Sequence, residues 1–417
     1  MTGSGATILA LAAGLSFSLG LSGADAQDSI RTQDSIKIGV VGPNSGPYAV
    51  IGEEVRNGFD LYLSQIGGMA GNRKVEILYE DTQAKPDVGL TKVQKLVERD
   101  GVSFLGGVVS SSVAYAIRDY VVAKNVPLVV TVASADGLTQ QQAAPNIFRT
   151  NSSGSQMSHP LGKWLHDSAG YKTLIMIAPN YAMGYEQTGG FARTFVEAGG
   201  KIVKTVYPPL GTPDFGPFLT SLDLGSADAI AAVFAGSDAI KFVKQYAEYG
   251  LKGQKPLVST ILLTDDLILQ QQGDAALGTV VASHYSSALE TPENKAFVEA
   301  YRKTYKRPPT LYSEASYVGA RIICDAIVAL KGDVSNIAAV TAAMRKADFA
   351  APRGHFRIDA YNSPIHNVHV FKVEKEGGSL INKPIAEFKD VSQFWTYDPK
   401  EYMAKPTYSD LANGWVK

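Results

Sequence analysis

The strongest constraint on the fold is a regular alternation between short β-branched runs and helical segments, which begins at Ile36 and restarts after Asn151. Apolar β-branched runs of this kind are typical of buried parallel strands, and their alternation with helices predicts a sheet covered by helices on both faces. The first series has strands at 36–42, 74–79, 104–108 and 127–131, with helices at 53–66, 86–99 and 112–124.

The second series repeats this alternation, which predicts a second sheet rather than an extension of the first. Its helices fall at 156–169, 185–198, 215–222 and 239–249, and its strands at 173–178, 202–207 and 229–234. The sequence therefore predicts an α/β protein of two doubly wound parallel-sheet lobes. Further helices are expected at 293–305 and 312–330, and a last strand at 367–373.

The C-terminal segment 376–417 loses the alternation but is too aromatic for a disordered tail. We expect it to wrap over one of the lobes. Its aromatic residues include Phe394, Trp395, Tyr397, Tyr402, Tyr408 and Trp415.

The N-terminus has the pattern of a cleavable export signal. Thr7 to Leu21 form a nearly uncharged apolar run, and Ala24-Asp25-Ala26 matches an A-x-A cleavage site, so residues 1–26 are expected to be removed. The segment departs from the usual pattern because Met1 to Ala6 contain no Lys or Arg. A misplaced start codon or an edited N-terminus would explain this, and the alternative to a signal is a disordered apolar tail.

Composition excludes several classes of protein. The chain carries 39 basic and 40 acidic residues, so it has no basic surplus of the kind that nucleic-acid binders use, and no nucleic-acid partner is expected.

Cys324 is the only cysteine, so the chain has no internal disulfide. It lies in an apolar helical pattern, which predicts a buried inert thiol. No cysteine stands at the cleavage site, so a lipid anchor is not expected.

Motifs for catalysis, cofactors or metals are absent from the sequence, and no cofactor is expected. His366 and His369 are three residues apart on a predicted strand, so their side chains should point to opposite faces. Asp265 and Asp266 are adjacent, which does not place two carboxylates together on a helix. We interpret them as a solvated turn or a helix N-cap.

Two polar strand ends predict a ligand site. Ser110-Ser111-Ser112 follows a strand and precedes a helix, where hydroxyls and free N–H groups can hold a carboxylate. The segment 131–136 offers small residues at the equivalent end of the next strand. In open α/β sheets, ligands lie at the carboxyl ends of strands. The alternative for the serines is an ordinary N-cap, which needs one serine.

Several short segments, in their order and spacing, resemble the leucine/isoleucine/valine-binding protein family, the type I periplasmic solute receptors of ABC transporters. The resemblance runs from about Ile36 to Val373. The segments are 36–47, Tyr79-Glu80-Asp81-Thr82, the Ser110–Ser112 turn, Phe148-Arg149-Thr150, Asn180-Tyr181-Ala182-Met183-Gly184 and 246–253.

The resemblance implies two lobes joined by three crossings, which here would fall near Thr150, Ser283 and Phe356. It implies lobe 1 at 36–150 and 284–356, lobe 2 at 151–283 and 357–375, and an extension at 376–417. Arg149, beside the first crossing, is expected to be a structural tether. The family further implies a freely diffusing periplasmic receptor that acts as a monomer, binds a small-molecule ligand and delivers it to a permease in the inner membrane.

In amino-acid-binding members of the family, the serine turn and the next strand end hold the ligand carboxylate, a role that carries over to Ser110, Ser111, Ala133 and Ser134. Such members also use an acid of the second lobe for the ammonium group, and here the aligned segment 259–263 has no acid before Asp265. Losing that acid removes the reason to bind a cation.

The family also places an aromatic residue where this chain has Ala235-Gly236-Ser237, which opens room for a larger ligand. Both departures favour a small organic acid, an aromatic carboxylate in particular. Tyr181 is expected to lie over its ring or meet its polar end, with Tyr48 and Tyr285 as further candidates.

Other interpretations remain open at this point. Within the family, the ligand could be a branched-chain or other amino acid, an amide or urea. A hydrolase with Ser111 as nucleophile would need a base, and no motif places one nearby, so we do not expect an enzyme. A sensory domain would continue into a membrane helix, and none follows Lys417.

Overall fold

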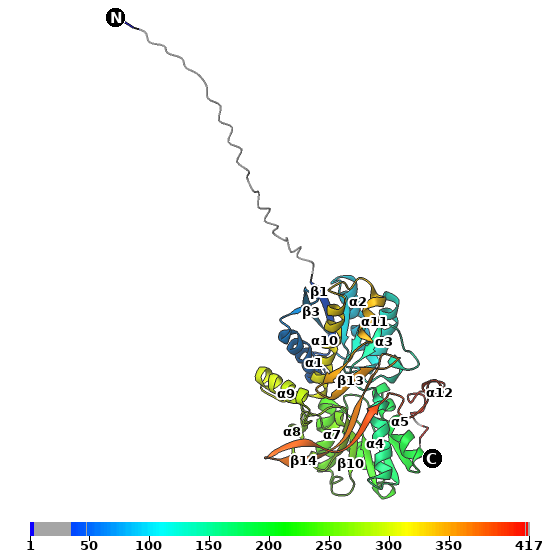
Figure 1. The fold of residues 1–417 in the computed structure, drawn as a ribbon. Helices are drawn as coiled ribbons and strands as arrows, with labels where there is room; N and C mark the ends of the chain where they lie inside the picture. The colour runs from blue at the N-terminus through cyan, green and yellow to red at the C-terminus, as the bar shows by residue number, and fades with distance from the viewer. Residues whose placement is uncertain (4–34, 47, 413, 416–417) are drawn as a thin grey trace. The chain divides into compact units, whose positions relative to one another are not determined.

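The computed structural model describes residues 1–3, 35–46, 48–412 and 414–415, so residues 4–26 of the predicted signal peptide and its cleavage site lie outside the described residues. The chain divides into two units, and the second, Ser35–Lys417, holds the sheets and helices described below. Within it, two sheets form separate layers with helices packed on both faces (Figure 1).

The first sheet has the strand order β2-β3-β1-β4-β5-β6. All neighbours from β3 to β6 pair in parallel, while β2 is antiparallel to β3. The strand bounds are β1 Ile36–Gly42, β2 Met69–Ala70, β3 Arg73–Asp81, β4 Phe104–Gly107, β5 Leu128–Val130 and β6 Ile147–Arg149.

Helices cover both faces of this sheet because its strands are apolar on both sides. Val93 of α2 and Ile117 of α3 share one apolar cluster, and Phe59 of α1 and Ile323 of α10 belong to another. The helix bounds are α1 Ala49–Gln65, α2 Pro86–Glu98, α3 Ser111–Lys124, α9 Pro292–Tyr305, α10 Leu311–Ala329 and α11 Ile337–Met344.

The second sheet has the order β12-β13-β14-β11-β10-β9-β7-β8, with β15 paired to β14. The run from β8 to β11 is parallel and the β14 edge is antiparallel. The strand bounds are β7 Thr173–Ile177, β8 Lys201–Val206, β9 Ala229–Ala232, β10 Leu257–Thr260, β11 Val280–Ser283, β12 Asp348–Ala351, β13 Gly354–Ile358, β14 Pro364–Glu376 and β15 Ser379–Val391. Its helices are α4 Gly154–Asp167, α5 Ala182–Glu197, α6 Gly216–Thr220, α7 Gly236–Glu248 and α8 Leu269–Gln272.

The two doubly wound parallel sheets confirm the predicted fold class. The end of the second lobe differs from our expectation, because the sheet continues past residue 375 through the hairpin β14–β15. Gly377 and Gly378 have φ of 58° and 85° and form its turn, a backbone conformation that suits glycine. In addition, β12 and β13 pair onward to β14, so residues 348–356 join the second sheet although we expected them in the first lobe.

The segment after β15 packs against the second sheet's helices, beside α5 in Figure 1. It includes the short helix α12 Pro399–Met403. The Tyr408 hydroxyl lies 2.6 Å from Nε2 of His159 on α4, and the guanidinium of Arg193 on α5 lies 3.7 Å from the ring centroid of Tyr397. These contacts place the aromatic residues after β15 against helices of the second lobe, whereas residues 379–391 of the expected extension form a strand of its sheet.

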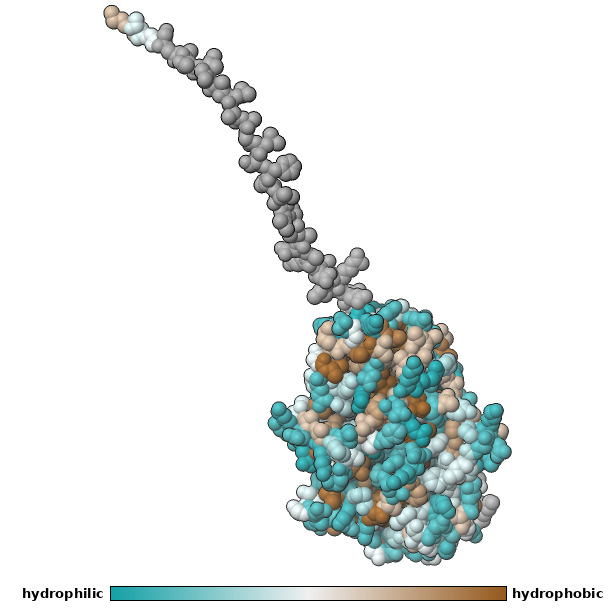
Figure 2. Space-filling view, viewed as in Figure 1, coloured by the Kyte–Doolittle hydropathy of each residue, from teal (hydrophilic) through white to brown (hydrophobic). Residues whose placement is uncertain are grey.

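On the face shown in Figure 2, hydrophilic side chains predominate and apolar ones are scattered. Large exposed apolar residues of the sheet-bearing unit include Val50, Met69, Tyr249, Val328 and Ile385. Within the described residues, none of the helices combines the length and apolarity that crossing a membrane would require.

Candidate ligand-binding site

A narrow cavity lies where helices of both sheets begin. Its volume is about 30 Å³, counted as the space that the centre of a water molecule can occupy. A solute can therefore enter only if the walls move apart. Its lining consists of Tyr48, Ile51, Val109, Ser111, Thr131, Val132, Ser134, Asn151, Met157, Tyr181, Met183, Ala235, Leu262, His284, Leu311 and Tyr312.

Helix N-termini from both lobes meet at this cavity. The lining includes the N-cap residues Tyr48 of α1, Tyr181 of α5 and Ala235 of α7, and Ser111, the first residue of α3. None of these helices has a side-chain hydrogen bond capping its N-terminus. The first N–H groups of a helix have no intrahelical partner and carry partial positive charge. Their convergence therefore favours a ligand with negative charge.

Four side-chain atoms in the described lining are buried without any hydrogen-bond partner: Ser111 Oγ, Ser134 Oγ, Tyr312 Oη and His284 Nε2. Leaving a buried polar group unpaired costs about 1–3 kcal/mol. Several such atoms around one cavity favour a polar occupant that supplies the missing partners.

The lining is also uncharged. The lining residues that the structure describes include no Asp, Glu, Lys or Arg. The buried carboxylate of Asp238, in the first turn of α7, is engaged outside the lining by Lys241 Nζ at 2.9 Å and by the Gly211 N–H at 2.7 Å. Burial, with the Arg353 charge adding to it, holds the pKa of His284 well below its usual value, so this lining histidine is neutral. An ammonium group would find no charged partner here.

The two lobes touch across the cavity through a pair of tyrosines. Tyr48 precedes α1 beside the first sheet, Tyr181 precedes α5 beside the second, and their hydroxyls lie 2.6 Å apart. The two residues sit at the N-termini of helices from different lobes, so their contact depends on how closely the lobes approach.

Of the residues expected at the site from sequence, the structure brings Ser111, Ser134, Tyr48 and Tyr181 together in the lining. Three others lie outside it. The Ala133 N–H donates to the Val108 carbonyl at 2.8 Å and is not free for a ligand. The Tyr285 hydroxyl donates to Asn294 at 2.8 Å, and the Ser110 carbonyl accepts the Ala114 N–H as part of the helix start.

Comparison with known proteins identifies the family. A family model described as periplasmic binding protein matches residues 35–378. The chain belongs to the periplasmic binding protein family. It is 32% identical over 363 residues to a Leu/Ile/Val-binding protein homolog 6 of Brucella melitensis, which covers 85% of this chain and 92% of the relative.

Solved structures of similar receptors support the same assignment. A Sphaerobacter thermophilus ABC transporter substrate-binding protein is 35% identical with a TM-score of 0.82, covering 86% of this chain and 99% of that one. A Rhodopseudomonas palustris BisB5 solute-binding protein, solved with 3,4-dihydroxybenzoic acid, is 30% identical with a TM-score of 0.83, covering 87% and 99%. A benzoate complex from R. palustris is 30% identical with a TM-score of 0.80, covering 86% and 99%.

As a periplasmic binding protein of the ABC-transporter type, this chain is a solute receptor rather than a member of an enzyme family. Its family implies a small-molecule ligand and a membrane permease as partner.

The sequence did not single out His284 or Tyr312 of this periplasmic binding protein. His284 follows β11 directly, beside the expected Tyr285, and adjacent residues on an extended chain point in opposite directions. Tyr312 is the second residue of α10, whose start is marked by the Thr310 and Ser313 capping box. That capping pattern could have identified the helix end but not the cavity that it reaches.

We expected the acidic pair Asp265-Asp266 in a solvated turn or at a helix N-cap; the structure places it at the start of a turn, but the Asp265 carboxylate is not solvated. Asp265 is buried, and burial, reinforced by Asp266, raises its pKa well above its usual value. Its Oδ1 accepts the Leu267 N–H at 3.0 Å, and Asp266 Oδ1 accepts Asn382 Nδ2 at 3.1 Å. These carboxylates hold the loop after β10 and do not line the cavity.

The other sequence interpretations of single residues agree with the structure. Cys324 is buried, and burial raises its pKa to about 12. Arg149 is a tether, because its Nη1 donates to the Ala133 carbonyl at 2.5 Å and its Nη2 donates to that of Ala135. His366 is buried while His369 is partly exposed, as expected for opposite faces of β14.

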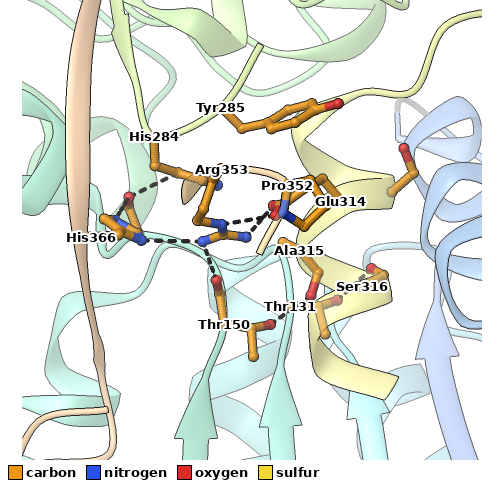
Figure 3. Close-up of polar contacts among 12 residues, drawn as sticks. Thr131, Thr150, His284, Tyr285, Glu314, Ala315, Ser316, Pro352, Arg353 and His366 are labelled. Atoms are coloured by element: carbon orange, nitrogen blue, oxygen red, sulfur yellow. Dashed lines mark hydrogen bonds and ion pairs between the residues drawn. The ribbon is translucent and has the colours of Figure 1, made fainter. Parts of the chain in front are cut away.

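A buried ion pair stands where the chain crosses between the sheets (Figure 3). Arg353 donates from Nε to Glu314 Oε1 at 3.0 Å and from Nη2 to Oε2, and both side chains are fully buried. Arg353 Nη1 also donates to the Thr150 carbonyl at 2.5 Å. The pair thus joins α10, the turn after β12 and the segment after β6, which fixes these crossings relative to one another.

Proposed function

We propose that this chain is the periplasmic receptor of an ABC importer for a small aromatic carboxylate, bound in the cavity between the lobes. The observation that carries the proposal is the uncharged lining, in which unpaired hydroxyls meet uncapped helix N-termini. A carboxylate can be held by several neutral donors in such a place. An α-ammonium group would be left without a counter-charge, which costs several kcal/mol.

The apolar part of the lining suits a flat ring. Ile51, Val109, Met157, Leu262 and Leu311 supply hydrocarbon walls. Ligand pockets combine apolar walls with a few directed polar groups in this way. Solved relatives at 30–32% identity were obtained with benzoate, 3,4-dihydroxybenzoic acid and p-hydroxybenzoic acid, which supports an aromatic acid for this chain as well.

We further infer that residues 1–26 direct export and are cleaved, that the mature protein diffuses in the periplasm as a monomer, and that it delivers its ligand to an inner-membrane permease. Ser111, Ser134, Tyr48 and Tyr181 are the proposed ligand contacts among the residues expected from sequence. Mass spectrometry of protein from the periplasm should find Gln27 as the first residue, and an uncleaved N-terminus in that fraction would contradict the export proposal.

A branched-chain amino acid is the second candidate, favoured by the names of the Brucella relatives. Isothermal titration of the purified mature protein with benzoate, 4-hydroxybenzoate and leucine separates the two. We expect binding of the aromatic acids and weak or no binding of leucine. Tight leucine binding without benzoate binding would overturn the aromatic-acid proposal in favour of the second candidate.

A further inference from the structure

His284 presents an unpaired ring nitrogen at the cavity, and a chain of contacts leads from its other nitrogen to a buried arginine. Nε2 has no partner among the described residues, while Nδ1 lies 2.9 Å from Ser152 Oγ. The same Ser152 Oγ lies 2.8 Å from His366 Nε2. The two imidazole rings are stacked, with centroids 4.9 Å apart and planes inclined by 15°.

The direction of the hydrogen bonds in this chain of contacts is set at its arginine end. Arg353 Nη1 lies 3.2 Å from His366 Nδ1 (Figure 3). A guanidinium group can only donate, so His366 Nδ1 must accept. A neutral imidazole carries one proton, which in His366 therefore stands on Nε2. Burial, with the nearby Arg353 charge, holds the pKa of His366 well below its usual value and keeps the ring neutral.

The proton on His366 Nε2 is then donated to Ser152 Oγ. The hydroxyl hydrogen of Ser152 needs an acceptor, and His284 Nδ1 is the remaining partner among the described contacts of that hydroxyl. If His284 Nδ1 carried a proton instead, the buried hydroxyl hydrogen and the Nε2 lone pair of His284 would both lack partners. The alternative therefore leaves one more buried polar group unsatisfied, at a cost of about 1–3 kcal/mol. His284 is consequently protonated on Nε2.

The arginine end is held firmly enough to impose this direction. Arg353 is 1% exposed and is fixed by Glu314, which is 0% exposed, and by the Thr150 carbonyl. The ion pair fixes the guanidinium in place, so the direction in which Arg353 donates is set by its surroundings. Partners that bond the far nitrogen of a histidine set its tautomer in this manner at other binding sites.

We propose that the relay Arg353–His366–Ser152–His284 fixes His284 as an Nε2–H donor to the ligand, and so selects ligands with an acceptor oxygen at this position over ligands with an ammonium group. The inference rests on the proposed function and adds a specificity determinant to it. A fixed N–H donor bonds a carboxylate or phenol oxygen, but it meets an ammonium group donor to donor. His366 and Ser152 are positioning residues, since they act through His284.

The tautomer is measured without any ligand. Two-bond ¹H–¹⁵N spectra of the ¹⁵N-histidine-labelled mature protein should show His284 and His366 protonated on Nε2 and unprotonated on Nδ1, with assignments from His284→Phe and His366→Phe. Protonation of His284 on Nδ1 would overturn the relay. Ser152→Ala should remove the fixed Nε2–H form of His284, and an unchanged His284 spectrum in that variant would show that Ser152 does not position the ring.

Ser158→Ala is the matched control. Ser158 is also buried, and its hydroxyl bonds the Gly154 carbonyl at 2.8 Å, away from the relay. Its loss should leave the His284 signals and ligand binding unchanged. A control that shifts the His284 tautomer as much as Ser152→Ala would mean that any buried serine deletion disturbs the ring, and the specific relay would be wrong.

Binding is then titrated with benzoate and 4-hydroxybenzoate. His284→Phe keeps a ring but removes the donor and should weaken the better-bound acid about tenfold or more, whereas His284→Gln, which keeps an amide donor, should recover part of that loss. Equal affinity of wild type and His284→Phe would overturn the donor role. If neither acid binds the wild type, the proposed function fails, while the tautomer measurement still decides the relay.

Discussion

Tyr48 and Tyr181, which belong to different lobes, place their hydroxyl oxygens 2.6 Å apart across the ligand cavity. Tyr48 is buried and Tyr181 is partly buried, and burial raises the pKa of each hydroxyl above its ordinary value, so the bond joins two neutral phenols. Because the cavity has little space open to water, this bond describes a closed arrangement of the lobes. The bond can form only when the N-termini of α1 and α5 lie close together.

We expect the two tyrosines to be energetically coupled in closure. Tyr48→Phe and Tyr181→Phe should each weaken benzoate binding, and the double variant should lose less than the sum by about 0.5–1.5 kcal/mol, the usual net value of one hydrogen bond. Titration calorimetry of the four proteins measures the coupling. Tyr249→Phe, which alters an exposed tyrosine, is the control. Strict additivity would show that the bond does not contribute to the liganded state.

Closure of the lobes can be measured by small-angle X-ray scattering as a change in the radius of gyration. Saturating benzoate should lower the radius of gyration of the wild type, because a ligand that contacts both lobes favours their approach. Ligand-free Tyr181→Phe should have a larger radius than ligand-free wild type if the tyrosine bond holds the lobes together. Identical scattering curves with and without ligand, in a sample shown calorimetrically to bind, would contradict lobe closure.

The unpaired hydroxyl of Ser111 predicts a loss of affinity on its removal. Ser111→Ala should weaken binding of an aromatic carboxylate by about 1–3 kcal/mol, because a charged acceptor loses one donor. Ser112→Ala is matched to it, since Ser112 is the next residue of α3 and is absent from the lining. Calorimetry should show a clear loss for Ser111→Ala and little change for Ser112→Ala. Comparable losses of affinity in both variants would show that the substitutions act by disturbing the start of α3 and not by removing the Ser111 hydroxyl.

Local patterns were enough to predict the two-sheet architecture and a few residues of the cavity lining. The β-branched runs indicated the parallel strands, and the rule that ligands lie at carboxyl ends of strands placed Ser111 and Ser134 at the site. The short strands β10 and β11 were not expected, because four apolar residues carry little periodic signal. The β14–β15 hairpin was also missed, although a Gly-Gly pair between two alternating runs is a recognised hairpin signal.

The remaining site residues could not be found from local sequence. His284 meets Ser152 at a separation of 132 residues, and Ser152 meets His366 at a separation of 214. No spacing rule connects positions so far apart, and each of these residues lies at an ordinary strand or helix boundary. Choosing Tyr285 over His284 reflects the same limit, because the sequence does not show which of two neighbours faces the cavity after the strand ends.

The buried ion pair predicts a large stability change when one partner is lost. Glu314→Gln leaves the Arg353 charge buried without a counter-charge, and should lower the free energy of unfolding by about 3–5 kcal/mol. Glu290→Gln, which alters an exposed pair with Lys295, should cost less than about 1 kcal/mol. Urea unfolding of the three proteins tests this. A loss for Glu314→Gln no larger than that for Glu290→Gln would show that Arg353 remains solvated.

The docking of the C-terminal segment on α4 predicts a specific acid sensitivity. His159 is buried, its Nε2 lies 2.6 Å from the Tyr408 hydroxyl, and burial together with the Arg193 charge lowers its pKa to about 3. In the unfolded chain the same histidine has a pKa of about 6.5. Between these two values the unfolded chain binds a proton that the folded chain does not. The stabilisation from a neutral His159 is therefore complete above about pH 6.5 and declines as the pH falls.

Between these two pKa values, His159 alone changes the free energy of unfolding by about 1.4 kcal/mol per pH unit. Buried acids with raised pKa values, such as Glu186, change stability in the opposite sense, so the variant must be compared with wild type at each pH. His159→Gln removes the histidine contribution, and the stability difference between wild type and variant should shrink by about 2 kcal/mol from about pH 6.0 to about pH 4.5. Parallel urea-unfolding profiles for wild type and His159→Gln would mean that His159 can be protonated without releasing the Tyr408 contact.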